Sequence, residues 1–115
     1  LIDDGVRVAF GSDWPVTSEV VLEGLPVSVH RQTPDRMPAG GWIPEQAITM
    51  PEAFAAYTSE VAYQAFGEKT WGTLAPGFNA DFVVLPKNPF DMDPHAVSDM
   101  HVLHTYRNGE AIYSA

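Results

Sequence analysis

The chain has no cysteine, few basic residues and no long apolar run. Without cysteine it can form no disulfide, no thiolate metal site and no cysteine nucleophile. Lys and Arg total 6 and Asp and Glu total 15, which gives a formal net charge of −9. Nucleic acids and anionic membranes select basic surfaces, and a membrane span needs about 20 apolar residues. We therefore expect neither nucleic acid nor a membrane as a partner. A cytoplasmic location is expected, although the absence of cysteine leaves the redox compartment undecided.

The composition is that of a folded protein, because 45% of the 115 residues are hydrophobic and 18% are charged. This length suits one modest domain and is too short for a whole (β/α)₈ barrel, which needs about 250 residues. The chain opens at Leu1, without methionine or a signal-like segment, and runs directly into an apolar stretch. We therefore expect it to be a fragment.

The first half of the chain predicts a strand, a helix and a long loop. Residues 6–10 are apolar enough for a buried strand that ends at Gly11. Residues 17–30 indicate a short helix, since glycine and proline interrupt its apolar spacing. Residues 32–46 contain three prolines and two glycines, which is typical of a long loop.

A capping-box pattern predicts where the next helix begins. Thr49 and Glu52 are three residues apart, with Pro51 in the first turn, so a helix over 50–57 follows. Thr58 and Ser59 offer a second cap, for a helix over 60–66 that ends at Gly67. The side chains expected in the core are Ala53, Phe54 and Tyr57 on the first helix, and Val61, Ala62, Ala65 and Phe66 on the second.

The last third of the chain reads as β structure. Residues 81–85 form a compact apolar strand closed by Pro86, and Asp81 is expected to tie down the preceding turn. Residues 86–100 predict a surface loop with one helical turn at 95–97. Residues 101–107 and 110–113 flank Asn108-Gly109, which is a strong signal for a hairpin.

Asp13 is the sharpest candidate for chemistry. A carboxylate just past the end of a buried strand suits a metal ligand or a general base in an α/β enzyme. The alternative is that its side chain caps the following turn, as Asp often does. From the local sequence alone both readings stay open.

The histidines do not make a metal centre by themselves. His101 and His104 lie on opposite faces of a predicted strand, and His95 is expected to be solvated in an acidic loop. His30 either lines a pocket or is a structural histidine with its hydrogen bonds satisfied. No H-x-H, H-E-x-x-H, G-x-S-x-G or phosphate-binding glycine loop is present.

Four motifs together resemble the C-terminal part of metal-dependent amidohydrolases of the family 3 type. The stretch G-x-L-x-x-G-x-x-A-D is the most diagnostic, and the resemblance covers essentially the whole chain. The motifs, in order, are FGSDWPV at 10–16, TSEVA at 58–62, GTLAPGFNADFVVL at 72–85 and TYRNG at 105–109.

The resemblance implies an α/β fold whose (β/α)₈ barrel holds one or two divalent ions, with zinc expected. Residues 1–70 would supply the last barrel strand and closing helices, and residues 71–115 part of a small β-sandwich. Asp13 would match the metal-binding aspartate of the last strand and act as the general base. The other metal ligands would lie upstream of Leu1.

The function implied is hydrolysis of non-peptide carbon–nitrogen bonds, in small-molecule amides or cyclic amides. Trp14, His30 and Arg31 are the candidates for contact with the substrate. The chain alone is expected to be inactive and to bind no metal, and to self-associate or pair with a missing N-terminal segment. The alternative is a standalone, non-catalytic assembly or binding module.

Overall fold

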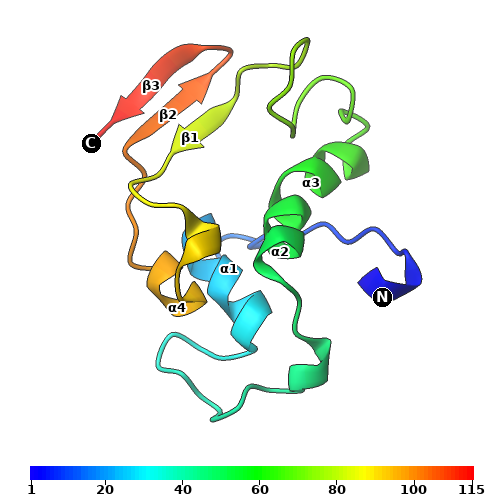
Figure 1. The fold of residues 1–115 in the computed structure, drawn as a ribbon. Coiled ribbons are helices and arrows are strands. Elements are labelled where there is room, and N and C mark those ends of the chain that lie inside the picture. The colour runs from blue at the N-terminus through cyan, green and yellow to red at the C-terminus, as the bar shows by residue number, and fades with distance from the viewer. The chain divides into compact units, whose positions relative to one another are not determined.

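The computed structural model describes residues 1–115 as a mixed α/β chain with one three-stranded antiparallel sheet (Figure 1). The predicted α/β class is confirmed at this level, whereas its origin in a (β/α)₈ barrel stays a prediction. No helix has both the length and the apolar character to cross a membrane. The helices are α1 (Val21–His30), α2 (Met50–Tyr57), α3 (Ser59–Gln64) and α4 (Pro94–Val97), and the strands are β1 (Phe82–Val84), β2 (His104–Arg107) and β3 (Glu110–Ser114).

The chain divides into two compact units, each built from separate stretches of sequence. We call Leu1–Phe10, Ala55–Pro86 and His101–Ala115 the sheet unit, and Gly11–Phe54 and Lys87–Met100 the helical unit. The predicted division into residues 1–70 and 71–115 stays a prediction.

The sheet unit is organised by the predicted hairpin. Strands β2 and β3 pair antiparallel around Asn108 and Gly109, whose φ angles of 50° and 80° suit a tight two-residue turn. The Asn108 N–H donates to Asp81 Oδ1 at 2.7 Å, and Gly109 N–H donates to Ala80 O at 2.9 Å. Asp81 therefore holds the turn of the hairpin, not the turn that precedes its own strand. The structural role predicted for Asp81 is confirmed, with a different partner.

The capping box at the start of α2 forms as predicted. The Thr49 N–H donates to Glu52 Oε2 at 2.7 Å, and the Glu52 N–H donates to Thr49 Oγ1 at 3.4 Å. The Thr49 hydroxyl also donates to Glu52 Oε2. These hydrogen bonds, the side-chain one first, hold the pKa of Glu52 below its usual value. The helix then spans Met50–Tyr57, as its sequence predicts.

The strand predicted over residues 6–10 is wrong. This segment has no strand beside it, although its Phe10 N–H donates to Ala56 O at 2.9 Å and its Phe10 ring packs edge-on against Tyr57. A strand requires a neighbour that completes its ladder of hydrogen bonds, and none of the three strands in the structure lies along these residues.

The end of α3 also differs from the prediction. The helix runs from Ser59 to Gln64, and Phe66 follows in a left-handed conformation with φ 57°. Its side chain is 95% exposed and Ala65 is exposed as well, so the prediction that these two residues belong to the apolar face is wrong. The Gly67 N–H donates back to Ala62 O at 2.7 Å, which closes the helix earlier than the apolar spacing indicates.

The helical unit is built on the packing of α1 against α4 (Figure 1). The predicted helical turn in the 86–100 loop is confirmed as α4, but the loop is more than a surface feature. Its Val97 is fully buried and its Met100 nearly so, together with Leu22 and Leu25 of α1. Residues 87–100 therefore contribute core to this unit, and α1 confirms the short helix predicted there.

The capping box gives the first testable prediction. Thr49→Ala removes the hydroxyl that caps α2, and we expect the free energy of unfolding in urea to fall by about 1 kcal/mol. Thr73→Ala is the matched control, because Thr73 is exposed and makes no side-chain hydrogen bond. Equal stabilities for the two variants would show that the cap contributes nothing to the fold.

The hairpin turn gives the second testable prediction. Gly109→Ala places a Cβ 3.9 Å from Ala80 Cβ, an ordinary contact, but at a φ of 80°, so we expect a loss of roughly 1–2 kcal/mol from backbone strain. Gly11→Ala, whose Cβ would meet nothing within 4 Å and whose φ is not positive, should cost less. Urea unfolding of both variants measures the difference, and its absence would argue against the turn described.

Candidate functional site

Asp13 lies in an exposed turn of the helical unit. Its backbone is left-handed, with φ 51°, and its carbonyl accepts the Val16 N–H at 2.9 Å. The Ser12 carbonyl accepts the Thr17 hydroxyl at 2.6 Å, which braces the same turn. The turn is closed by these bonds, while the Asp13 carboxylate itself accepts no hydrogen bond. The structure therefore does not contain the side-chain cap that the sequence leaves open as an alternative.

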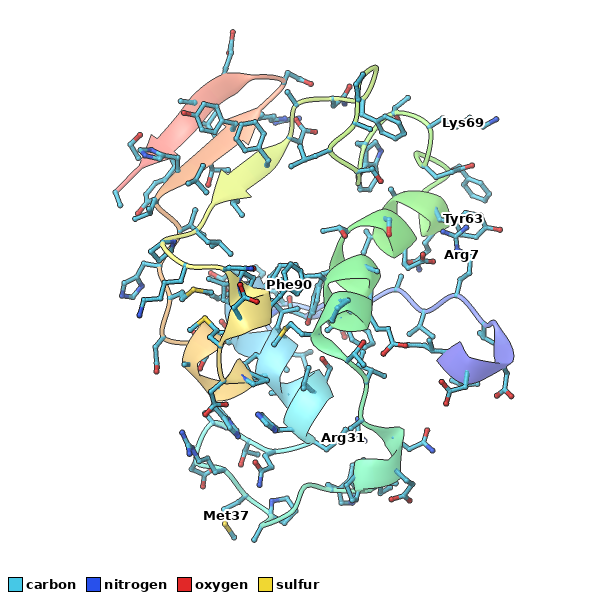
Figure 2. All side chains as sticks on the ribbon, in the orientation of Figure 1. Arg7, Arg31, Met37, Tyr63, Lys69 and Phe90 are labelled. Carbon is cyan, nitrogen blue, oxygen red and sulfur yellow. The ribbon has the colours of Figure 1, made fainter.

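Arg31 begins the long loop at the end of α1. It caps the helix in a left-handed conformation, φ 57°, and its N–H donates to Val27 O at 2.8 Å. The Arg31 Nε donates to Trp42 O at 3.1 Å, and the guanidinium carbon lies 5.3 Å from the centre of the Trp42 ring. Arg31 thus contacts Trp42 within the same loop, and Met37, which lies between them in the sequence, projects outward (Figure 2).

His30 and His95 form a parallel stack within the helical unit. Their ring centroids are 4.1 Å apart and their planes differ by 9°. His95 Nε2 lies 3.0 Å from Gln32 Oε1, and His30 Nε2 lies 3.5 Å from Asp93 Oδ1. The second pair is an ionic contact without hydrogen-bond geometry, so the buried His30 Nε2 has no hydrogen-bond partner. We refer to His30 and His95 as the histidine stack.

The electrostatics of this cluster follow from its packing. Burial lowers the pKa of His95, the charges of His30 and Arg36 lower it further, and Asp93 opposes them. The pKa of Asp93 lies below its usual value, first because Asp93 accepts the His95 backbone N–H and then because of His30. The prediction that His95 is solvated in an acidic loop is therefore wrong, since its ring is covered by His30.

The sequence-predicted site residues do not converge. Trp14 is 66% exposed beside Asp13, His30 faces His95, and Arg31 contacts Trp42. No hydrogen bond or ion pair joins Asp13 to any of them. No group of three or more His, Asp or Glu side chains in the structure is arranged to hold a metal ion. The assignments of Asp13 as ligand and base, and of the three others to substrate, stay predictions.

The sequence analysis missed the histidine stack and a small hollow in the sheet unit. The hollow, of about 250 Å³, is lined by residues that include Arg7, Glu60 and Tyr63. Arg7 donates to both Glu60 oxygens, at 2.5 and 2.9 Å, and its guanidinium lies 3.7 Å from the centre of the Tyr63 ring (Figure 2). Its charge is therefore already paired. Both features join residues more than 50 positions apart, so no local pattern indicates them.

Comparison with protein families identifies one match. A family model described as "Amidohydrolase family" matches residues 1–113. No solved structure matches the chain.

Curated relatives match over almost the same range, 98% of the chain in each case. The LONG AFTER FAR-RED 3 protein of Arabidopsis thaliana is 37% identical. YtcJ of Bacillus subtilis (strain 168), whose name assigns it provisionally to the amidohydrolases, is 31% identical. An N-substituted formamide deformylase of Arthrobacter pascens is 30% identical. The chain spans about a fifth of the length of these relatives.

The loop between Arg31 and Trp42 offers a test of this geometry. A Cβ on Gly41 would lie 2.4 Å from His30 O, whereas a Cβ on Gly40 would meet nothing within 4 Å. Both residues have positive φ, 88° and 81°, so Gly40→Ala controls for backbone strain. We expect Gly41→Ala to lower the free energy of unfolding by about 1–3 kcal/mol more than Gly40→Ala does, because its Cβ would clash with backbone. Similar values in urea unfolding would contradict the loop geometry.

Proposed function

This chain belongs to the amidohydrolase family, and from that membership we propose that it is the C-terminal part of a metal-dependent hydrolase. The bonds cleaved would be carbon–nitrogen bonds outside peptides, as in amides and cyclic amides. Two relatives support this class, since one bears an amidohydrolase name and another acts on N-substituted formamides by its name.

The observation that carries the proposal is the state of Asp13. Its carboxylate is exposed and accepts no hydrogen bond, and its backbone is held in the left-handed region by a turn closed through other atoms. Asp adopts this region more readily than most residues, and Arg31 adopts it as a helix cap. The feature that supports a chemical role is therefore the carboxylate, which is exposed and engaged in no structural hydrogen bond.

The residues present do not by themselves fit a metal ion. Asp13 offers one carboxylate, and neither histidine nor a second acid joins it. The resemblance implies one or two divalent ions with further ligands from elsewhere, so the role proposed for this chain is limited to the Asp13 carboxylate.

In the proposed reaction the Asp13 carboxylate accepts a proton from the attacking water. The water oxygen forms a bond to the carbonyl carbon, and the bond from that carbon to nitrogen breaks. Asp13 then returns the proton to the leaving nitrogen. A carboxylate that is free of hydrogen bonds and reachable from solvent is suited to this exchange.

Trp14 and Arg31 are proposed to border the substrate. Trp14 follows Asp13 directly and exposes most of its indole, which offers an apolar wall. The Arg31 guanidinium donates one hydrogen bond, from Nε to Trp42 O, so its other nitrogens can pair with a substrate carboxylate. His30 is the weakest of the three, because its ring already packs against His95.

We also propose that further strands pair with the sheet unit, from an N-terminal segment of a longer chain or from a second copy. Strand β3 lies at the edge of the sheet, so one of its sides has no hydrogen-bonding neighbour. All of its residues are exposed, and the apolar side chain of Ile112 is 62% exposed. Unprotected edges of this kind pair readily with other strands.

The decisive experiment compares Asp13→Asn with wild type in the intact protein. We expect metal-dependent hydrolysis of simple amides and N-formyl compounds to fall by about 10²–10⁴-fold in kcat, because the amide cannot accept the proton. Asp99→Asn is the control, since Asp99 is exposed and makes no side-chain hydrogen bond or ion pair.

Unchanged activity in Asp13→Asn would remove the role of Asp13 and leave the hydrolase class in place. An intact protein that binds no divalent metal and hydrolyses none of these compounds would instead favour the non-catalytic binding module.

A further inference from the structure

The histidine stack joins two segments that are far apart in the sequence. His30 is the last residue of α1, and His95 lies in α4. Their parallel rings, 4.1 Å apart, are a direct contact between these helices, whose packing forms the core of the helical unit. A change in the charge of the two rings therefore acts on that packing.

The stack also holds the start of the long loop. Gln32 Nε2 donates to Arg36 O at 3.1 Å and to Pro38 O at 2.9 Å, which fixes the orientation of the amide. Gln32 Oε1 must then accept, so His95 donates to it from Nε2. Through this one amide the His95 ring is connected to the fold of residues 32–38.

Different charged groups face the two rings of the stack. A proton on His30 Nε2 faces the Asp93 carboxylate 3.5 Å away. His95 has no comparable partner: Nε2 already donates to Gln32, and Arg36 adds a positive charge from the loop. Two imidazolium rings stacked at this distance repel each other across a partly buried gap.

We propose that the histidine stack is a pH-sensitive clasp, which is closed while at most one of its two rings is positively charged and opens when both are. Opening separates α4 from the end of α1 and releases the loop over residues 32–46. This inference does not rest on the proposed function.

The direction of the pH effect follows from His95. Its pKa in the folded protein lies below the ordinary value of 6.5, so the unfolded or open form binds more protons in that range. Stability is thus full above 6.5 and is lost as the pH falls below it. The pKa of Asp93 is also lowered, but from 3.8, so its contribution is lost only in a more acidic range.

Hydrogen–deuterium exchange of the intact protein, corrected for intrinsic rates, tests the proposal. Between about pH 7.5 and about pH 5.5 we expect protection of residues 28–42 and 90–100 to fall by roughly tenfold. Residues 50–57 of α2 are the internal reference and should change little. His30→Phe keeps a flat ring that cannot be charged, and it should abolish the fall.

His101→Phe is the matched control, because it removes an exposed histidine outside the stack and should keep the fall. If His30→Phe shows no protection at the higher pH, His95→Gln replaces it, since its amide can still donate to Gln32. Equal protection at both pH values in wild type would overturn the proposal. So would a fall that persists in the uncharged variant.

Discussion

Backbone hydrogen bonding determines which parts of this chain take regular structure. Where a short stretch can satisfy its own N–H and C=O groups, the element forms: the Thr49–Glu52 box begins α2, and the Asn108–Gly109 turn returns β3 onto β2. Residues 6–10 have no strand beside them and form no ladder of hydrogen bonds. The sheet unit has two strand edges without a partner. The helical unit contains no strand, and its backbone bonds lie in helices, in turns and in a few contacts between loop and helix, such as Trp42 N–H to Arg31 O at 2.7 Å.

This difference explains what the sequence could predict. The bounds of α2, the hairpin and the helical turn at α4 depend on residues that are close in sequence, and their predictions are confirmed. The strand at 6–10 and the burial of Phe66 were inferred from hydrophobicity alone, which says nothing about whether a partner surface exists. His95 contacts His30 and Gln32, which are more than 60 positions away in the sequence. Its acidic neighbours in the sequence favoured a solvated side chain, and they carry no information about these distant contacts.

The candidate site follows the same pattern. Asp13 could be chosen from its place after an apolar run and from the motifs around it, and the family match over residues 1–113 supports that choice of motifs. What surrounds Asp13 could not be predicted, because contacts between segments that are far apart in the sequence leave no local pattern. The chain spans about a fifth of its relatives, and its own donors do not converge.

The small size of the buried side chains has a thermodynamic consequence. Ala53, Ala56 and Ala62 are almost fully covered, whereas Leu25 and Val97 are the largest side chains buried to the same degree. Alanine allows backbones to approach closely but removes little apolar area from water. The heat-capacity change of unfolding scales with that area, so we expect it to lie below the usual value of about 12–15 cal/mol/K per residue. The stability of these residues should therefore vary only gently with temperature, with a broad thermal transition and little tendency to cold denaturation.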